Sequence, residues 1–348
     1  MKYIAVDPGK EQCKFALYEE SKDKTSVFGF QTKMSEGYFE DDAIEANTFI
    51  AEIDGKVYKI GAGATKKASL ETSKMLDIHK FCVLTSIAMC CSSKEEEEVS
   101  VAIGMPVEEY YNIPKRNEFR DFIAPLGTHE IKMKNSSNAP IVTKRFKIVN
   151  HCVLPESIGA LFLDGAIEDA EGTVGVLDLG SLNNNLSVFR NGEMDKDMYK
   201  TNEFGGSILL AGLASELSSR YSRIDTNLVL EILCKPKEER KLNSKSPTIN
   251  EESKDVITNY LLDHCQKIKQ DINAKGWSLD FIKLVCIGGT SSILANELRE
   301  VFGNDIYIPD QPEFANVVGF LRTCYAKFGT EEKIIPMPQS MQLKTVAS

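Results

Sequence analysis

Two stretches of this sequence interrupt a buried strand in the same way, and they constrain the fold more than any other feature. Residues 3–18 read YIAVDPGKEQCKFALY, and residues 176–189 read VLDLGSLNNNLSVF. Each contains an apolar run, an aspartate, a glycine two positions later, a polar cluster and a second alternating run, which is the pattern of a tight hairpin. The two aspartates, Asp7 and Asp178, lie about half a chain length apart, and helical segments follow each hairpin. We therefore expect an α/β protein made of two similarly built halves.

Length and charge narrow the class of protein. The chain has 348 residues, of which 42% are hydrophobic, so it can form two domains or a single large one. Its formal net charge is −10, and a surface of that sign repels phosphate backbones. We expect no direct contact with nucleic acid.

The cysteines and the hydropathy pattern indicate a cytoplasmic protein. The nine cysteines form an odd set without CxxC spacing, which favours reduced thiols over a disulfide framework or a zinc site. No secretion signal and no apolar span of 18 residues is visible, so neither export nor a membrane anchor is expected.

Periodicity places further elements around the two hairpins. A second hairpin is expected over 47–62, where Asp54–Gly55 is a strong turn signal, and a buried strand is expected to stop at Gly104 and Pro106. The polar stretch 235–254 favours a loop or a small inserted subdomain. Apolar spacing predicts helices over 73–91, 202–221, 251–275 and 311–328.

The two Asp-x-Gly hairpins suggest a chemistry. Glycine at a hairpin tip leaves backbone N–H groups unshielded, and such amides bind phosphate oxygens. An aspartate would repel phosphate alone, but it can hold the water shell of Mg²⁺. Two such hairpins facing each other across a cleft would hold a metal–triphosphate from both sides. Taken singly, each hairpin is more simply explained as ordinary turn chemistry.

Glu156 admits two interpretations. It follows Pro155, where a helix is expected to begin, so it could simply be a first-turn carboxylate that complements the helix dipole. Alternatively, it could orient a water molecule for attack on a terminal phosphate. The four histidines, His79, His129, His151 and His264, show no ligand spacing and are interpreted as structural or surface residues.

Seven motifs in order resemble the actin-like ATPase superfamily, and within it the ParM/StbA group of plasmid-segregating bacterial actins. The motifs are the first Asp hairpin, GMPVEEYY, LPESIGA, the second Asp hairpin, NEFGG before a helix, IGGT and EFANVVGF. The likeness spans about residues 1–328. It implies two similar RNase H-like domains around a nucleotide cleft, each with a small subdomain. The implied bounds are 1–155 plus 314–340 for domain I, 156–313 for domain II, and about 30–90 and 215–260 for the small subdomains.

The resemblance also implies roles for residues of the two hairpins. Asp7 would approach Mg²⁺ through water, Lys14 would contact the β and γ phosphates, and Asp178 would lie on the metal side of the second loop. Glu156 would polarise the attacking water, so the implied catalytic residues are Glu156, Asp178 and Asp7. The residues implied to contact phosphate are Gly9, Lys10, Glu11 and Gln12 in the first loop, and Gly180, Ser181, Leu182 and Asn183 in the second.

Three other segments would surround the nucleoside. Glu203, Gly205 and Gly206 resemble the segment that lines the ribose, and Lys267 would touch the sugar or base. The IGGT motif resembles the adenosine motif, which implies Gly288, Gly289 and Thr290 beneath the nucleoside.

The loops depart from the pattern of the group. Pro8 and Lys10 stand where a second acidic or glycine residue and a hydroxyl are usual, and Leu182–Asn183 stands where Gly/Thr–Thr is common. With fewer hydroxyls near the γ-phosphate, we expect the rate of hydrolysis to be affected more than nucleotide binding. Lys10 could compensate for the missing group or could point to solvent.

The function that the resemblance implies is a cytomotive filament. ATP or GTP with Mg²⁺ would drive head-to-tail self-assembly, and hydrolysis would destabilise the polymer and so drive plasmid segregation in a bacterial cytoplasm. A small DNA-binding adaptor on a centromere-like site would link the acidic filament to a plasmid. The alternative is a small-molecule kinase, such as a sugar or acetate kinase, or another non-filament ATPase on the same fold. A chaperone-type ATPase and a membrane-associated cell-shape actin are disfavoured, because neither a substrate-binding domain nor an anchor is visible.

Overall fold

The chain divides into two compact units. The computed structural model describes residues 1–41, 44–67, 74–163, 172–274, 279 and 282–338. The first unit is Met1–Asp164 together with Asn316–Ser348, and the second is Gly165–Ala315. Glu156, which we expected to open the second domain, therefore belongs to the first unit.

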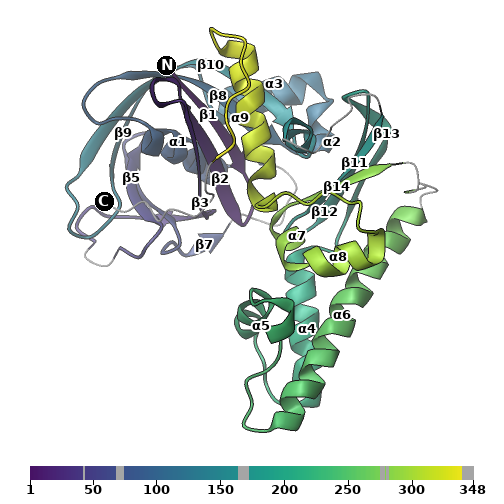
Figure 1. The fold of residues 1–348 in the computed structure, drawn as a ribbon. Coiled ribbons are helices and arrows are strands. Elements are labelled where there is room, and N and C mark those ends of the chain that lie inside the picture. Colours follow the sequence, from purple (N-terminus) through teal and green to yellow (C-terminus); the bar gives the residue numbers. More distant parts are fainter. Residues whose placement is uncertain (42–43, 68–73, 164–171, 275–278, 280–281, 339–348) are drawn as a thin grey trace. The chain divides into compact units, whose positions relative to one another are not determined.

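The first unit is built on a ten-stranded sheet with the order β3-β2-β1-β8-β10-β9-β5-β6-β4-β7 (Figure 1). Strands β1, β2 and β3 are antiparallel neighbours, whereas β8 runs parallel to β1, and β10 runs parallel to β8. The bounds are β1 (Lys2–Pro8), β2 (Gln12–Glu19), β3 (Lys24–Gln31), β4 (Lys33–Glu36), β5 (Thr48–Ile53), β6 (Lys56–Gly61), β7 (Lys66–Lys67), β8 (Glu97–Met105), β9 (Gly127–Lys134) and β10 (Val142–Pro155).

Helices pack on both faces of this sheet, because successive side chains of a strand point to opposite faces. Ile4 and Val6 of β1 share a core with the apolar residues of helix α1. Tyr3, on the other face, packs edge-on against Tyr325 of helix α9 at 4.8 Å between ring centroids. The helices of this unit are α1 (Asp77–Cys90), α2 (Val107–Tyr110), α3 (Ile113–Ile123) and α9 (Ala315–Phe328), with short 3-10 helices η1 (Glu20–Lys22) and η2 (Ile158–Phe162).

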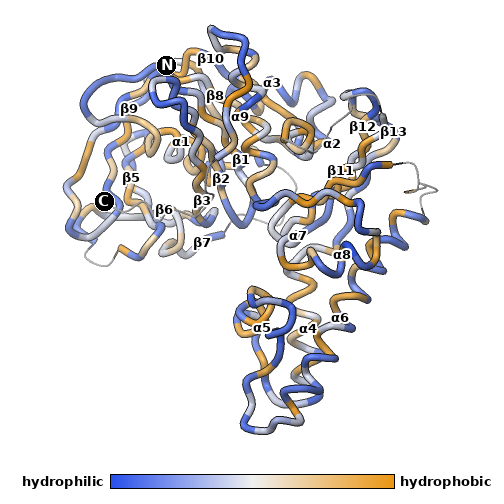
Figure 2. The backbone as a smooth tube through the Cα atoms, viewed as in Figure 1, coloured by the Kyte–Doolittle hydropathy of each residue, from blue (hydrophilic) through white to orange (hydrophobic). Residues whose placement is uncertain are grey.

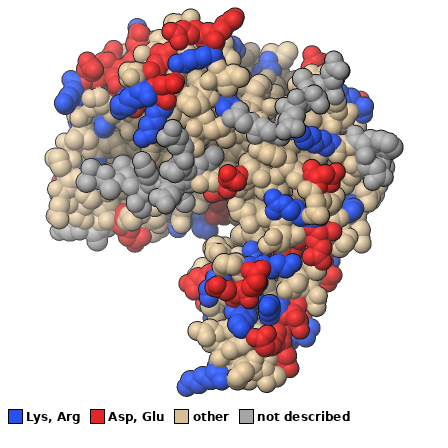
Figure 3. Space-filling view, viewed as in Figure 1, with Lys and Arg blue, Asp and Glu red and all other residues tan. Residues whose placement is uncertain are grey.

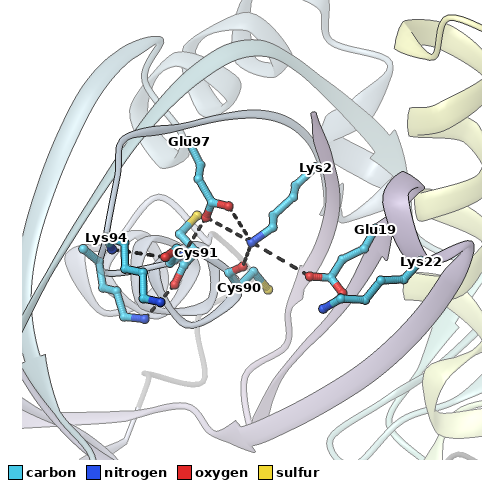
Figure 4. A network of polar contacts seen from close by, with 9 residues as sticks. Lys2, Glu19, Lys22, Cys90, Cys91, Lys94 and Glu97 are labelled. Carbon is cyan, nitrogen blue, oxygen red and sulfur yellow. Dashed lines mark hydrogen bonds and ion pairs between the residues drawn. The ribbon is translucent and has the colours of Figure 1, made fainter.

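A half-buried lysine, Lys2, links the start of β1 to its neighbours (Figure 4). Lys2 Nζ donates to the carbonyl oxygen of Cys90 at 2.8 Å and forms an ion pair with Glu97 at 2.8 Å. Cys90 ends α1 and Glu97 begins β8, so one ammonium joins three elements. The first strand is thus held at its N-terminal end, and Asp7 lies near its other end.

The second unit has a four-stranded sheet, β13-β12-β11-β14, and a set of helices (Figure 1). Its longest helix, α6, has 27 residues and a buried stripe that includes Ile257, Leu261, Cys265, Ile268 and Ile272, spaced by three or four positions. Figure 2 shows the resulting alternation of polar and apolar residues along α6. The bounds are β11 (Thr173–Leu179), β12 (Asn184–Arg190), β13 (Glu193–Asn202), α4 (Gly206–Arg220), α5 (Thr226–Leu233), η3 (Lys237–Glu239), α6 (Pro247–Asn273), β14 (Lys283–Ile287), α7 (Gly289–Ile293), α8 (Ala295–Phe302) and η5 (Pro312–Phe314).

The two sheets share one topology, which confirms the expectation of two similarly built halves. The order β3-β2-β1-β8 in the first unit corresponds to β13-β12-β11-β14 in the second. In both, three consecutive strands are antiparallel, and a strand from later in the chain pairs in parallel with the first of them. The first strand of each set is the one that carries the aspartate of an Asp-x-Gly hairpin.

Most of the other expected elements are present. Asp54 and Gly55 have φ angles of 51° and 75°, as a two-residue hairpin turn between β5 and β6 requires. The four expected helices appear as α1, α4, α6 and α9, and the stretch 235–254 contains a loop, η3 and the start of α6. After Pro155 the described residues form the short 3-10 helix η2. The single tryptophan, Trp277, lies outside the described residues.

The structure also shows the state of the cysteines and the character of the helices. All nine cysteines are unpaired, and all except Cys234 are buried. Among the described residues, no helix combines the length and apolar character that crossing a membrane demands. On the face drawn in Figure 3, acidic and basic side chains are interspersed over the α5 and α6 region.

Candidate functional site

The two Asp-x-Gly hairpins form the same turn. Asp7 and Asp178 are each the penultimate residue of their strand, and each is half-buried. A β-carbon on Gly9 would lie 2.5 Å from the carbonyl oxygen of Gln12, and one on Gly180 would lie 2.7 Å from that of Asn183. In both turns the oxygen belongs to the residue three positions after the glycine, so glycine is required by close approach of the backbone. Each turn therefore places a carboxylate and a closely packed glycine at equivalent positions in the two sheets.

The first turn is braced by a neighbouring strand end. The amide of Gly9 donates to the carbonyl oxygen of Asp7 at 2.9 Å, and Thr32 contributes two further bonds. Its amide donates to the carbonyl oxygen of Glu11 at 3.0 Å, and its hydroxyl donates to that of Gly9 at 2.5 Å. Lys14 lies directly opposite Asp7 in the β1–β2 register, so the two side chains share one face of the sheet.

Lys74 joins the carboxylates of Asp7 and Glu156. The Lys74 side chain is only 4% exposed, and its Nζ lies 2.5 Å from Glu156 Oε1 and 3.4 Å from Asp7 Oδ1. Burial alone would lower the pKa of Lys74, but the charges of Glu156 and Asp7 raise it above its ordinary value. Lys74 is therefore a buried ammonium between two carboxylates.

The end of β10 and the N-terminus of α9 fix the position of Glu156. The amide of Glu156 donates to the carbonyl oxygen of Met105, and the next amide, that of Ser157, donates to Asn316 Oδ1 at 3.0 Å. Ser157 has a φ of 74°, in the left-handed region, and Gly159 packs against the backbone of Asn316. The motifs LPESIGA and EFANVVGF, which are far apart in the sequence, are thus in contact.

The interpretation of Glu156 as a first-turn helix residue is wrong. Glu156 lies in a turn between β10 and η2, before any helical residue, and its carboxylate pairs with Lys74. The sequence alone did not reveal this lysine, which precedes an apolar helix and belongs to none of the motifs. No local signal could have found it, because its partners are 67 and 82 residues away.

Two further basic groups lie near this pair of carboxylates. Burial and the charge of Lys74 lower the pKa of Lys10, while Glu156 opposes the shift. Lys10 is half-buried. Burial, followed by the charges of Lys74 and Lys10, lowers the pKa of His79 to about 3, so this ring stays neutral.

In the second unit, three separate motifs meet at the second turn. The carbonyl oxygen of Gly180 accepts from the Thr290 hydroxyl at 3.0 Å and from the Gly206 amide at 2.9 Å. The Ser207 amide donates to the carbonyl oxygen of Ser181 at 2.7 Å, so the first amides of α4 are directed at the turn. The structure therefore brings together the second Asp hairpin, the Gly-Gly segment before α4 and the IGGT motif.

Other expected residues adjoin this cluster. A β-carbon on Gly288, whose φ is 88°, would lie 2.6 Å from Asp178 Oδ1, and Gly205 packs against the backbone of Leu182 and Asn183. Glu203 and Gly289 are exposed beside these glycines. Lys267 is also exposed; it lies on α6 one turn after His264, whose Nε2 is 3.1 Å from the carbonyl oxygen of Phe204.

In the first loop, Glu11 forms an ion pair with Lys67 at 3.5 Å, and Gln12 is exposed. The glutamate side chain at this position is thus directed toward β7, while its backbone takes part in the turn.

The donor set is compatible with Mg²⁺ but not with a site made of protein ligands alone. Among the described residues, no group of three or more His, Cys, Asp or Glu side chains could hold a metal ion. Magnesium, however, is commonly held by one or two carboxylates, water and substrate phosphates. The Asp7 carboxylate also lies 3.4 Å from the Lys74 ammonium.

The comparisons agree with this geometry. Residues 5–159 match the family model described as "Actin like proteins N terminal domain". The matched segment includes Asp7, Lys74 and Glu156, so the first half of the candidate site lies entirely within it.

Solved structures show the actin-like fold for nearly the whole chain. The Alp12 filament structure has a TM-score of 0.72 and 24% identity, covering 94% of this chain and 99% of that one. An archaeal actin homologue, Ta0583, has a TM-score of 0.74 and 15% identity, covering 94% and 100%. A 15-stranded ParM filament from Clostridium botulinum has a TM-score of 0.68 and 18% identity, covering 93% and 98%. No curated protein matches the sequence. The expected resemblance to ParM-like bacterial actins is confirmed.

Proposed function

We propose that this actin-like protein binds ATP or GTP with Mg²⁺, assembles into head-to-tail filaments and hydrolyses the nucleotide to control them. The observation that carries this proposal is the repeated Asp-x-Gly turn, one copy in each unit, with Thr290 and the α4 amides directed at the second copy. A glycine turn lets a phosphate approach the backbone closely, and the amides of such a turn are suited to phosphate oxygens.

The residues of the chain have distinct roles in this proposal. Backbone amides of each turn would bind phosphate oxygens, Asp7 and Asp178 would hold a hydrated Mg²⁺, and that ion would neutralise developing charge. The Glu156 carboxylate orients the attacking water and accepts its proton. Gly205, Gly206 and Gly288 allow their segments to pack closely against the second turn and Thr290, and the nucleoside would lie beside these segments.

Filament formation is supported by the fold. The structural neighbours include an Alp12 filament and a ParM filament. A head-to-tail contact that does not close on itself produces an open polymer. The net charge of −10 argues that such a polymer reaches DNA through a small basic adaptor bound to a centromere-like site. We infer a role in plasmid segregation in a bacterial cytoplasm.

Sedimentation and light scattering test the proposal directly. Purified protein with Mg²⁺ and ATP or GTP should scatter light above a critical concentration, pellet, and release inorganic phosphate. Negative-stain images of the pelleted sample should show filaments. If neither nucleotide produces a pellet and the protein instead transfers phosphate to a sugar, the filament assignment is wrong and a small-molecule kinase is the better assignment.

A further inference from the structure

Lys74 contacts the Glu156 carboxylate, to which the proposed function assigns the orientation of the attacking water. We propose that Lys74 is a positioning residue, which holds the Glu156 carboxylate beside Asp7 and thereby sets the rate of nucleotide hydrolysis without contributing to nucleotide affinity. This inference rests on the proposed hydrolysis, and it adds a residue that the resemblance to bacterial actins did not supply.

The contacts of Lys74 are too costly to be incidental. Taking an ammonium out of water is unfavourable unless opposite charges surround it, and Lys74 is only 4% exposed. Its two partners are the carboxylates of Asp7 and Glu156, at 3.4 and 2.5 Å. These were the acidic residues of the first unit that the sequence had already indicated as functional.

Another buried lysine shows that burial alone does not produce this arrangement. Lys134 is 7% exposed, and its Nζ donates to a backbone carbonyl oxygen, that of Asp41, at 3.3 Å. Lys134 therefore provides a matched control for the loss of a buried lysine from the first unit.

The position of Lys74 is set by rigid elements. Three residues after it, α1 begins, and this helix packs against β1, β2 and β10. Strand β1 carries Asp7, and β10 ends immediately before Glu156. The two carboxylates that contact Lys74 are thus placed by the central sheet, and Lys74 itself lies just before a helix that packs on that sheet.

The proposal predicts a division between rate and affinity. The backbone of the first phosphate turn is held by its own hydrogen bonds and by Thr32, and Lys74 contacts this turn through the Asp7 carboxylate. Replacing Lys74 should therefore leave the phosphate-binding amides in place. The Glu156 carboxylate should then lose its contact with Lys74 and its fixed orientation, which should slow nucleotide hydrolysis.

The experiment compares Lys74→Met, Glu156→Gln, the double variant and the control Lys134→Met. With saturating nucleotide, Lys74→Met should lower the hydrolysis rate about tenfold or more, as loss of an orienting partner typically does. The dissociation constant for a fluorescent nucleotide should stay within about threefold of wild type. The double variant should be no slower than Glu156→Gln, because both changes disable the same group. Lys134→Met should hydrolyse at the wild-type rate.

Two further measurements keep the test decisive. Lys74→Arg, which retains the charge, should recover part of the rate lost in Lys74→Met. In thermal unfolding without nucleotide, Glu156→Gln should be less destabilising in the Lys74→Met background than in the wild type. In the wild type the substitution removes a charge partner of the buried Lys74 ammonium, whereas the Lys74→Met protein has no ammonium there.

The outcomes separate this inference from the proposed function. Three results would overturn the role of Lys74. The first is a Lys74→Met protein that hydrolyses nucleotide at the wild-type rate, and the second is a loss of affinity as large as the loss of rate. The third is a double variant in which the effects of the two substitutions on the rate multiply. Independent effects in thermal unfolding would overturn the contact itself. A wild type that binds nucleotide but never releases phosphate would instead overturn the proposed hydrolysis, and with it any rate-setting role.

Discussion

The Thr290 hydroxyl donates to the carbonyl oxygen of Gly180 at 3.0 Å, which joins two segments that are 110 residues apart in the sequence. The amide of Gly206 donates to the same oxygen at 2.9 Å. A carbonyl oxygen has two lone pairs, so both acceptor positions of Gly180 are used within the protein. The second Asp turn therefore owes its position to the start of α4 and to the IGGT motif.

The close packing around this turn predicts the effect of one added methyl group. A β-carbon on Gly205 would overlap the backbone of Leu182 and Asn183, which cannot move without displacing the turn. Gly205→Ala should therefore lower the free energy of unfolding by about 1–3 kcal/mol and weaken nucleotide binding. Chemical denaturation and titration with a fluorescent nucleotide measure the two effects.

Gly172→Ala is the matched control for this substitution. No heavy atom lies within 4 Å of the β-carbon that it would add, so stability should change by less than about 0.5 kcal/mol. Equal stability of the Gly205→Ala and Gly172→Ala proteins would show that the turn tolerates movement and is not held as rigidly as the contacts imply.

The two turns were predictable from sequence because their causes are local. The glycine of each turn meets the carbonyl oxygen only three residues later, so aspartate, glycine and flanking apolar runs are all visible in a short window. The hairpin at Asp54–Gly55 has the same local origin. The similarity of the two halves could be anticipated for this reason, since each half repeats the same short signal.

The charge arrangement around Glu156 could not be predicted in this way. Lys74 approaches Glu156 from 82 residues away, and its own neighbours in the sequence are those of an ordinary apolar helix. A helix was expected to begin directly after Pro155, but a turn at Ser157 comes first and η2 follows it. The Ser157 amide in this turn bonds to the side chain of Asn316. These contacts come from tertiary structure, which residue spacing does not encode.

Glu156 should control the chemical step and not assembly. Glu156→Ala removes the proposed water-orienting carboxylate, so phosphate release should slow by about 100-fold, the usual scale for loss of a general base. Filaments formed with ATP or GTP should persist longer than those of the wild type, because the nucleotide stays intact. Phosphate release and the decay of light scattering measure the two effects.

The control for this substitution is Glu98→Ala, since Glu98 is exposed and pairs only loosely with Lys147 at 3.8 Å. It should hydrolyse nucleotide at the wild-type rate. If Glu156→Ala abolishes nucleotide binding itself, the residue holds the site together and the assigned role is incorrect.

His79 should make the stability of the protein sensitive to acid. Burial and the charges of Lys74 and Lys10 lower its pKa from 6.5 to about 3, so between these values the unfolded chain takes up a proton that the folded protein does not. The stability from neutral His79 is present above about pH 6.5 and declines as the pH falls toward 3, with a slope of up to about 1.4 kcal/mol per pH unit. His79→Gln removes this titration, so thermal unfolding followed from pH 7 to pH 4.5 should show a smaller loss of stability in the variant than in the wild type. Parallel curves for the two proteins would mean that His79 is protonated in the folded state, which the positive charges of Lys74 and Lys10 should prevent.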